Sequence, residues 1–413
     1  MAKRPTVVIT VNSPGEVAAW LAPVVVQLGQ RLPSSRIVVV VPPCPFASGA
    51  EVDVIRKMEQ VTEVIGPEDA FGLLFRRRRP DWGDRGLVLF LGGDPAFAGR
   101  LARRLGYPAA AYVERVAGAL NFQQYFAAYP PVAEELRTRG KSNVHFVGNL
   151  MASAVKGRAE EVAVDLGVQP GETVLSFFPG SRPWQICHLV PFFLEMAQLL
   201  GQALVQHQLM IMSPFVEEEQ LVNAASKPSS ILGGITATCV ERWEGVAGNK
   251  VVVLKTVQGH RVTAVWGARY ELMKGSTLAV TIPGTNTAEL GYLHVPTVVL
   301  VPLHRPEIIP LPGLIQWVGR IPRLGPVLKR RAVETYLRTH PYVALPNQWV
   351  GREIMPEYKG SFQAADVVCC LRALLEAPQR LESIRKQLAE LAPTQDTASV
   401  MVELLIEQFG LRG

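Results

Sequence analysis

The sequence has 413 residues, which at roughly 100–200 residues per domain predicts two or three domains. Hydrophobic residues make up 48% of the chain, and this excludes a largely disordered protein. The net charge is +6, from 42 basic minus 36 acidic side chains. Such a basic excess favours an anionic partner, such as a nucleotide, a lipid headgroup or a nucleic acid.

The cysteines, the histidines and the distribution of apolar residues bear on the cellular compartment, on metal binding and on membrane insertion. The five cysteines form no CxxC pair and no regular framework, so we expect a reducing compartment. The seven histidines form no ligand pattern, so we expect no structural metal. We also expect no signal peptide and no membrane-spanning helix, because no window of about 18 apolar residues occurs.

The first part of the chain alternates between strands and helices. Strands are predicted at residues 6–11, 36–41, 86–91, 109–113 and 144–147, and helices at 17–32 and 50–59. This order predicts a parallel sheet with right-handed crossovers. Asp94 follows one of these strands, at the edge where open parallel sheets bind ligands. Asp94 is also a good helix cap, because Pro95 comes next, and the two roles are compatible.

Two segments combine apolar and basic residues. In the first, Leu73, Leu74 and Phe75 directly precede four arginines, Arg76, Arg77, Arg78 and Arg79. This run is either a solvated helix end or a membrane contact in which the arginines bind anionic headgroups. It carries no motif that reads nucleic acid, so we expect no such partner. The second segment, 302–328, is broken by prolines and is either a lipid-facing surface or a buried connector.

A polar, charged segment at 156–167 predicts a domain boundary, and a second set of strands and helices follows it. The predicted strands are at 173–178, 208–212, 251–254, 278–282 and 295–301. The predicted helices run from residue 183 to about 204 and over 288–293, 364–375, 380–391 and 399–409. This pattern predicts a second α/β domain.

Two turns in this second half are candidates for binding a nucleotide diphosphate. The first turn consists of Gly180, Ser181 and Arg182. The guanidinium of Arg182 can bind phosphate in a bidentate manner. The second turn and helix start consist of Gly284, Thr285, Asn286 and Thr287. Free N–H groups and the helix dipole there favour an anion, and Glu289 could accept hydrogen bonds from ribose hydroxyls. The alternatives are a surface arginine after an ordinary turn in the first case and an ordinary capped βα turn in the second, the latter being about equally well supported.

Several of these motifs, in this order, resemble those of lipid-A-disaccharide synthases. The matching stretches are Val144–Asn149, Phe178–Arg182, Pro283–Glu289, His294–Pro296, Tyr342–Asn347 and Gly351–Glu353. Leu-Pro-Asn followed by Gly-Arg-Glu is the most specific of them, because other two-domain transferases do not usually carry it. The similarity extends over most of the chain and is closer in the second half.

The resemblance implies an α/β fold of the GT-B type, with two Rossmann-like domains whose parallel sheets face a central cleft. It implies an acceptor-side domain at 1–155 with membrane contact, a nucleotide-sugar domain at 156–385, and helices at 386–413 that pack back on the first domain. The family moves an acylated glucosamine from UDP to an acylated glucosamine phosphate, with inversion and without a metal. The resemblance therefore implies a peripheral membrane transferase at the cytoplasmic face, a lipid-linked or saccharide acceptor, and no cofactor.

The resemblance also assigns roles by position. The donor-side residues are Gly180, Ser181, Arg182, Gly284, Thr285, Asn286, Thr287, Glu289, Asn347 and Arg352. Glu16 matches the family's Gly-Glu turn, and Asp94 matches the proposed base when one residue is deleted before Pro95; without that gap, Gly93 falls there. Either Asp94 or Glu16 would deprotonate the acceptor hydroxyl, and domain closure would bring the two halves together.

Departures from the family pattern lie mostly in the first half. Ala96 replaces a second carboxylate, and residues 114–121 lack the family's Trp-Ala-Trp stretch. We therefore expect the donor chemistry to be retained, and the identity of the acceptor stays open. Two other classes stay open: a UDP-sugar epimerase of the same two-domain plan, and a non-catalytic relative that binds nucleotide or membrane.

Overall fold

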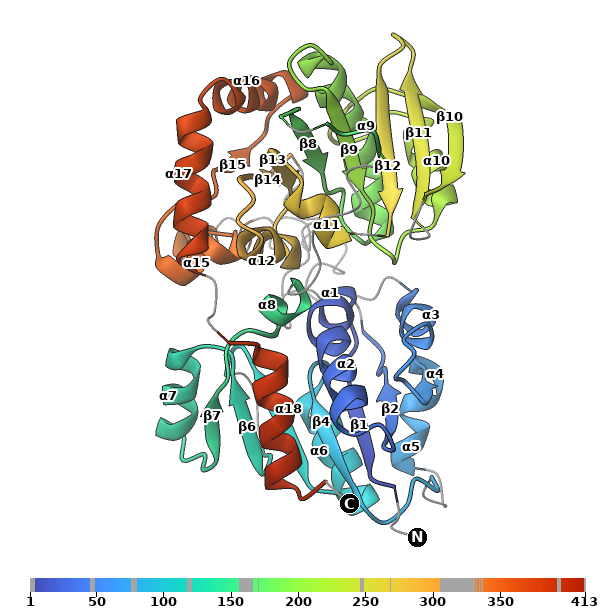
Figure 1. The fold of residues 1–413 in the computed structure, drawn as a ribbon, viewed down its shortest axis with the longest axis vertical. Helices are drawn as coiled ribbons and strands as arrows, with labels where there is room; N and C mark the ends of the chain where they lie inside the picture. The colour runs from blue at the N-terminus through green and yellow to red at the C-terminus, as the bar shows by residue number, and fades with distance from the viewer. Residues whose placement is uncertain are drawn as a thin grey trace. The chain divides into compact units, whose positions relative to one another are not determined.

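The computed structural model describes residues 4–44, 49–75, 80–116, 121–155, 166–169, 171–245, 249–267, 269–304, 331, 333, 335, 337–391 and 395–411. The chain forms two compact units, shown in Figure 1. Unit 1 contains Met1–Lys156 and Pro393–Gly413, and unit 2 contains Gly157–Ala392. Each unit is built around its own sheet, and the units are described separately below.

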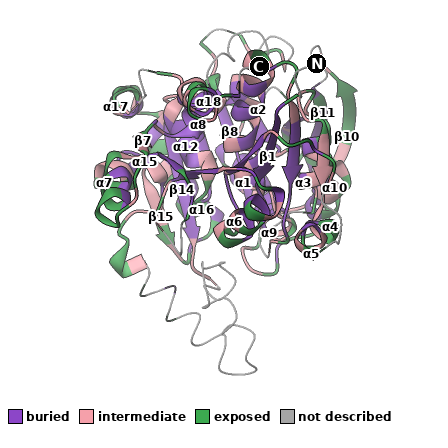
Figure 2. Cartoon of the chain, turned by 90° about the horizontal axis from the view of Figure 1, so that it is seen from below, coloured by how far each residue is buried: buried purple, intermediate pink, exposed green. Residues whose placement is uncertain are grey.

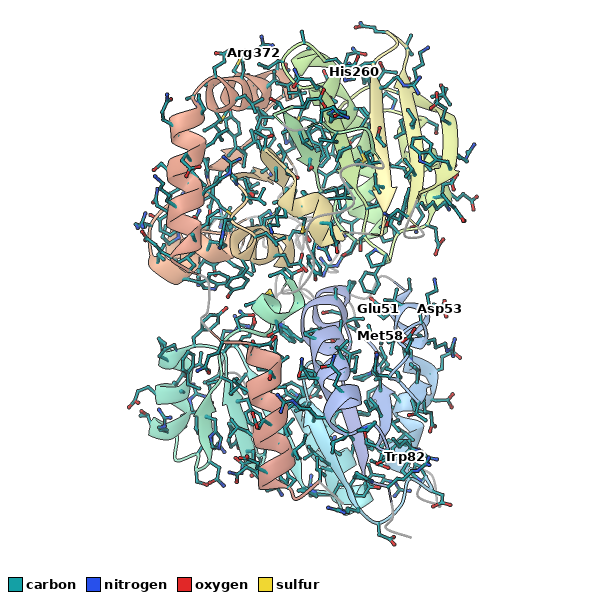
Figure 3. The ribbon with its side chains drawn as sticks, viewed as in Figure 1. Glu51, Asp53, Met58, Trp82, His260 and Arg372 are labelled. Atoms are coloured by element: carbon teal, nitrogen blue, oxygen red, sulfur yellow. The ribbon has the colours of Figure 1, made fainter. Side chains whose placement is uncertain are left out.

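Unit 1 contains a seven-stranded parallel sheet in the order β3-β2-β1-β4-β5-β6-β7. The strands are β1 Thr6–Thr10, β2 Arg36–Val40, β3 Glu63–Ile65, β4 Gly86–Phe90, β5 Ala109–Val113, β6 Gln124–Ala127 and β7 Val144–Phe146. Strands β1 and β5 are buried along their whole length, as expected for parallel strands covered on both faces. Figure 3 labels Trp82 near the amino end of this sheet and Glu51 near its carboxyl end.

Helices follow the strands of unit 1 in turn. They are α1 Pro14–Glu16, η1 Val17–Leu21, α2 Ala22–Arg31, α3 Glu51–Arg56, α4 Pro67–Ala70, α5 Gly72–Phe75, α6 Pro95–Leu105, α7 Pro130–Thr138, α8 Leu150–Val155 and α18 Thr397–Gln408. The single helix predicted at 17–32 begins with a π-helical turn, in which the N–H of Ala22 bonds to Val17. Pro23 explains the wider turn, because its ring would clash with the carbonyl four residues earlier.

The C-terminal helices belong to different units. Helix α17 (Pro378–Ala389) lies in unit 2, whereas α18 packs against α2 and α8 in unit 1. Asp396 caps α18 by accepting the N–H of Ser399 at 3.0 Å, and its Oδ1 also accepts the Ser153 hydroxyl at 2.9 Å. The last helix is thus attached to unit 1 by apolar packing and by its own cap.

Unit 2 contains an eight-stranded sheet in the order β10-β11-β12-β9-β8-β13-β14-β15. The strands are β8 Val174–Phe177, β9 His207–Ile211, β10 Ala237–Glu244, β11 Lys250–Thr256, β12 Arg261–Trp266, β13 Leu278–Thr281, β14 Thr297–Pro302 and β15 Glu357–Gly360. The six neighbouring strands β12, β9, β8, β13, β14 and β15 pair in parallel. Strands β10 and β11 extend this sheet at the β12 edge by antiparallel pairing.

The described helices of unit 2 are α9 Pro183–Leu200, α10 Glu218–Ala225, α11 Arg269–Lys274, α12 Thr285–Tyr292, α15 Leu345–Val350, α16 Ala364–Leu375 and α17. Helix α9 has the largest number of buried residues among them and packs against α10 and α16. In Figure 2 strand β1 is purple, whereas α7 and α17 carry green, exposed residues. The apolar core of each unit combines sheet residues with the inner faces of the helices that cover the sheet.

The predicted class, two parallel-sheet α/β domains of the GT-B type, is confirmed by this architecture. All ten predicted strands form, with ends that shift by a few residues at most. Strands β3, β6, β10, β12 and β15 were not predicted. Every helix within the described residues is too short or too polar to cross a bilayer.

Candidate functional site

Each sheet contains a topological switch point, where successive connections leave in opposite directions. In unit 1 it lies between β1, which leads to β2 on one side, and β4 on the other. In unit 2 it lies between β8, which leads to β9, and β13. Open α/β sheets bind ligands outside the carboxyl ends of the strands at this point. The sequence-predicted turns at 180–182 and 284–287 follow β8 and β13, and Glu16 and Asp94 follow β1 and β4.

Glu16 is enclosed by the backbone of the two loops at the unit 1 switch point. Its Oε2 accepts the N–H of Asn12 at 2.8 Å, and the N–H groups of Ser13 and Gly93 also bond to the carboxylate. Burial raises the pKa of Glu16 to about 7, although these N–H groups oppose the shift. A Cβ on Gly92 would lie 2.0 Å from Oε2, so only glycine lets the loop after β4 approach this closely.

Asp94 is exposed and starts helix α6. Its Oδ1 accepts the N–H of Ala96 at 2.8 Å, and Pro95 is the first helical residue. The structure therefore shows the capping role that the sequence predicts for Asp94. The catalytic role stays a prediction.

Glu114, which was not among the sequence candidates, directly follows β5 at the same edge. Its Oε1 accepts hydrogen bonds from the Tyr112 hydroxyl at 3.3 Å and from Asn149 Nδ2 at 3.1 Å. The pKa of Glu114 is raised to about 7, mainly by burial and to a smaller extent by the charge of Glu16. The hydrogen bonds from Tyr112 and Asn149, and the nearby indole N–H of Trp20, act in the opposite direction and lower it.

Leu73 does not lie at the surface, so it is not available to a membrane. The residue is 2% exposed and lies in the core of unit 1, and Leu74 packs against that core. Phe75, in contrast, is 80% exposed. Leu74 also lines a shallow pocket with Arg100, Arg103 and Arg104 of α6. The predicted contact residues Arg76 to Arg79 lie outside the described part of the chain, as does the segment 305–330.

In unit 2, the turn before α9 is closed by an internal cap. Gly180 has φ +96°, and a Cβ there would lie 2.3 Å from Gln185 Oε1. That oxygen accepts the N–H groups of Ser181 at 3.0 Å and Arg182 at 3.1 Å. These N–H groups are therefore already used, and the half-buried Arg182 side chain is the anion-binding group that this turn can offer.

The turn before α12 is more open. Gly284 is exposed and Thr285 and Asn286 are half-buried, and their N–H groups donate no hydrogen bond that we find within the described residues. Thr287 is fully buried: its hydroxyl donates to the Gly284 carbonyl at 2.8 Å and accepts the N–H of Leu345 at 3.1 Å. The first N–H groups of a helix have no partner in the helix itself, so this turn can receive an anion.

Glu289 is fully buried and is already paired. It forms an ion pair with Arg269, and its Oε1 accepts the Tyr270 hydroxyl at 3.3 Å. Arg269 Nη2 also donates to Asn286 Oδ1 at 2.7 Å. The predicted ribose contact of Glu289 would require this network to rearrange, because both of its oxygens have partners. In the present arrangement the network fixes the start of α12.

Asn347 acts as an internal brace. Its Nδ2 donates to the Met355 carbonyl at 2.7 Å and to Glu357 Oε1 at 2.9 Å, and its Oδ1 accepts the N–H groups of Ile354 and Met355. This uses both donors and both lone pairs of the amide, so Asn347 shapes the loop after α15 from within. Arg352, by contrast, is exposed and donates to Gln387 of α17.

No set of three His, Cys, Asp or Glu side chains in the described chain is arranged to hold a metal ion. The groups that the structure does assemble are of two kinds. Unit 1 places half-buried carboxyl groups at its switch point, and unit 2 places an arginine and a helix start at its own. Together with the two parallel sheets, this defines the class of the molecule as a two-domain α/β protein of the GT-B type.

Comparisons with known proteins agree with that class. No protein-family model matches the chain. Lipid-A-disaccharide synthase of Geobacter sulfurreducens is 29% identical over 160 residues, which are 38% of this chain and 34% of that protein. The Syntrophus aciditrophicus synthase is 21% identical over 288 residues, 67% of this chain and 62% of that protein. The Koribacter versatilis synthase is 26% identical over 329 residues, 76% and 70% of the two chains.

The chain is therefore a divergent relative of lipid-A-disaccharide synthases, as the motifs predicted. It spans 34% and 62% of the length of the first two relatives, so their activity is not carried over as a fact. Solved structures with the same fold include UDP-GlcNAc 2-epimerase of Neisseria meningitidis bound to UDP-GlcNAc (TM-score 0.52, 12% identity, 98% and 100% of the chains). Arabidopsis thaliana UGT89C1 in complex with UDP gives the same values.

Three features of the site were missed in the sequence. Gln185, which closes the first turn, and Arg269, which pairs with Glu289, carry no local signal for these roles. Glu114 does have a local signal. It is a carboxylate that directly follows a buried parallel strand, and the same pattern indicated Asp94.

Proposed function

We propose that the chain is an inverting glycosyltransferase that moves an amino sugar, with or without acyl chains, from a UDP-sugar to a lipid-linked or saccharide acceptor. The observation that carries the proposal is the unit 2 switch point, where Arg182 and the open helix start at Thr285 follow neighbouring strands. The similarity to lipid-A-disaccharide synthases supports it, and so does the shared fold with proteins solved in complex with UDP or UDP-GlcNAc.

In this proposal unit 2 binds the nucleotide sugar. The Arg182 guanidinium and the N–H groups of Thr285 and Asn286 bind the diphosphate and stabilise the negative charge that grows on it as the sugar leaves. Each such donor can contribute a few kcal/mol to the transition state. Thr287 and Asn347 hold the turn and the following loop in shape through the hydrogen bonds described above.

Unit 1 would supply the base. The acceptor oxygen forms its bond to C1 of the sugar while the bond from C1 to the phosphate oxygen breaks, and the electron pair leaves with UDP. The acceptor's hydroxyl proton goes to a carboxylate at the unit 1 switch point, for which the sequence predicts Glu16 or Asp94. A single displacement of this kind inverts the configuration at C1.

A lipid-linked acceptor also implies a membrane surface, and we place that contact near α5 and α6. Phe71 and Phe75 are 52% and 80% exposed, and Arg100 and Arg103 lie beside Leu74. Exposed aromatic rings flanked by arginines match the chemistry of an anionic bilayer surface. In this proposal the protein works at the cytoplasmic face of the cell membrane.

Ligand-induced thermal stabilisation tests the donor site. A ligand that binds only the folded protein raises its melting temperature. We expect a shift with UDP and UDP-GlcNAc that exceeds the shift with GDP or TDP, and we expect Arg182→Ala to lose it. The matched control is Arg372→Ala: Arg372 is exposed on α16, at the opposite end of the unit 2 sheet, where Figure 3 labels it, and this variant should keep the shift. No shift with any nucleotide would refute the proposal.

A UDP-sugar epimerase is the second candidate, because solved structures of the same fold include UDP-GlcNAc 2-epimerase. An epimerase needs no acceptor. Isomerisation of UDP-GlcNAc by the purified protein alone would therefore favour this candidate, and UDP release that depends on an added acceptor would favour the transferase. Nucleotide binding without either reaction would indicate a non-catalytic relative.

A further inference from the structure

Three carboxylates lie at the carboxyl edge of the unit 1 sheet, and they differ in what occupies their oxygens. Asp94 is exposed and uses Oδ1 to cap α6. Glu16 is surrounded by backbone N–H groups of two loops, and the close approach of Gly92 leaves no space beside its Oε2. Glu16 therefore joins the loop after β1 to the loop after β4 and has little room to meet another molecule.

Glu114 has a different environment, made of side chains. The two hydrogen bonds that we find at its carboxyl group, from Tyr112 and Asn149, both end on Oε1. Within the described residues no lysine or arginine pairs with it. The titratable groups that face this cluster are Glu16, Tyr112 and, through Asn149, Tyr129. Oε2 is therefore the oxygen that can interact with another molecule.

The partners of Glu114 are themselves held in place. Asn149 is 3% exposed, and its Oδ1 accepts the N–H of Met151 at 2.8 Å, which directs Nδ2 toward Glu114 and the Tyr129 hydroxyl. The Tyr112 hydroxyl also accepts the N–H of Leu150 at 3.1 Å. Glu114 is thus oriented from two sides by groups that are fixed to α8.

Trp20 adds a third, incompletely satisfied donor. Its ring meets Tyr112 edge to face, with ring centroids 5.5 Å apart. Its Nε1 is buried and makes no hydrogen bond of normal geometry within the described residues, yet it lies near enough to Glu114 to lower that carboxyl's pKa. A buried donor without a good partner is costly, so its place beside a carboxylate indicates a polar site rather than apolar packing.

We propose that Glu114, rather than Asp94 or Glu16, is the carboxylate that takes the proton from the acceptor hydroxyl, with Glu16 and Asn149 as its positioning residues. This deepens the proposed function and rests on it. The acceptor O–H bond breaks and its proton goes to Glu114 Oε2; the acceptor oxygen bonds to C1 of the sugar; and the electron pair of the broken C1–O bond leaves with UDP. Glu114 then returns its proton to water.

A base of this kind operates best when its pKa lies near the working pH. Glu114 meets this condition, because burial and the neighbouring charge of Glu16 raise its pKa to about 7. At neutral pH about half of the Glu114 carboxyl groups are therefore ionised and able to accept a proton. The pKa of Glu16 is also raised to about 7, so its charge acts on Glu114 as Glu16 itself ionises.

The test compares variants in acceptor-dependent UDP release, with a UDP-linked acylated glucosamine as donor and an acylated glucosamine phosphate in detergent micelles as acceptor. We expect Glu114→Gln to lose at least about 100-fold in kcat, the lower bound typical of general-base removal. Its UDP-induced thermal shift should stay at the wild-type value, because that ligand binds unit 2. Glu68→Gln, an exposed residue of α4, is the matched control and should keep full activity.

The pH dependence separates a proton acceptor from a structural carboxylate. Wild-type kcat/KM should rise with pH up to about 7, and this rise should disappear from the residual activity of Glu114→Gln. Glu16→Gln should move the rise to lower pH, because it removes the charge that raises the pKa of Glu114. If Glu114→Gln fails to fold, Glu114→Asp, which keeps the carboxyl group, should keep the rise at reduced kcat.

Two results would overturn the inference. One is near-wild-type turnover by folded Glu114→Gln, and the other is a larger loss in Asp94→Asn than in Glu114→Gln. Absence of any transfer by the wild-type protein refutes the proposed function and this inference together. Transfer by the wild type with an active Glu114→Gln refutes only this inference.

Discussion

Replacing Glu114 by glutamine should change how the stability of unit 1 depends on pH. The folded carboxyl group keeps its proton up to about pH 7, whereas in the unfolded chain it loses the proton near 4.5. Between these values the folded state binds more protons than the unfolded state. The stabilisation is therefore fully present below pH 4.5 and is lost as the pH rises through 7. Glutamine has the same shape and does not titrate, so Glu114→Gln should lose this pH dependence.

The size of the effect follows from the two pKa values. At about 1.4 kcal/mol for each pH unit, the difference between 4.5 and about 7 amounts to about 3 kcal/mol, of which about 2.5 kcal/mol falls between pH 5 and pH 8. Relative to wild type, Glu114→Gln should thus gain about 2.5 kcal/mol on going from pH 5 to pH 8. For a unit of this size that corresponds to a difference of about 5–10 °C in melting temperature.

Hydrogen–deuterium exchange of peptides that span β1, β4 and β5 measures the opening of unit 1 by itself, and calorimetry at pH 5 and pH 8 gives the melting temperatures. Comparing the same variant at two pH values cancels any change in packing that does not depend on pH. The control is Glu68→Gln, whose side chain is exposed and hydrated in both states, so its effect should be equal at both pH values. An equal effect of Glu114→Gln at pH 5 and pH 8 would refute a raised pKa for Glu114.

Two further predictions concern the close contacts of the switch points. Arg269→Met leaves the fully buried Glu289 without its cation and should lower the free energy of unfolding by roughly 3–5 kcal/mol, as measured by denaturant titration. The double variant Arg269→Met/Glu289→Gln should recover most of this loss. A loss below about 1 kcal/mol in the single variant would contradict the ion pair. Gly92→Ala places a methyl group 2.0 Å from Glu16 Oε2 and should destabilise unit 1 by about 1–3 kcal/mol, whereas Gly99→Ala, inside α6 with nothing within 4 Å, should stabilise it by about 0.5–1 kcal/mol. Equal melting temperatures for these two glycine variants would show that Glu16 moves aside freely.

The strands that the sequence predicted are those with a run of buried apolar residues. Strand β5 was predicted with the ends that the structure shows, because all five of its residues are buried. Strand β10 was missed because most of its residues are exposed at the sheet edge, so no apolar pattern marks it. Strand β6 begins with the buried polar residue Gln124, which is paired with Gln408 of α18, and such a distant contact leaves no trace in the local sequence.

The same distinction applies to the site. Turns after buried strands were predictable, because strand ends and glycines are local signals. The hydrogen-bond partners and pKa values of the groups in those turns could not be predicted, because they depend on contacts with residues elsewhere in the fold. Gln185 occupies two N–H groups that the sequence suggested for phosphate, and Arg269 occupies Glu289 from 20 residues away. The pKa of Glu114 likewise depends on the fold: burial and the charge of Glu16 raise it, while Tyr112, Asn149 and Trp20, from three separate segments, lower it.

The two switch points share one topology but differ in charge, and this difference assigns their roles. A diphosphate needs positive partners, and the unit 2 switch point offers Arg182 and the open helix start at Thr285. The unit 1 switch point holds the half-buried carboxyls of Glu16 and Glu114, and both pKa values are raised because the loss of solvent is not offset by a cation. A diphosphate placed there would be repelled as those carboxyls ionise, whereas a neutral hydroxyl would meet a group able to accept its proton. The arrangement of charge thus favours donor binding in unit 2 and acid–base chemistry in unit 1, whichever sugar acceptor the protein uses.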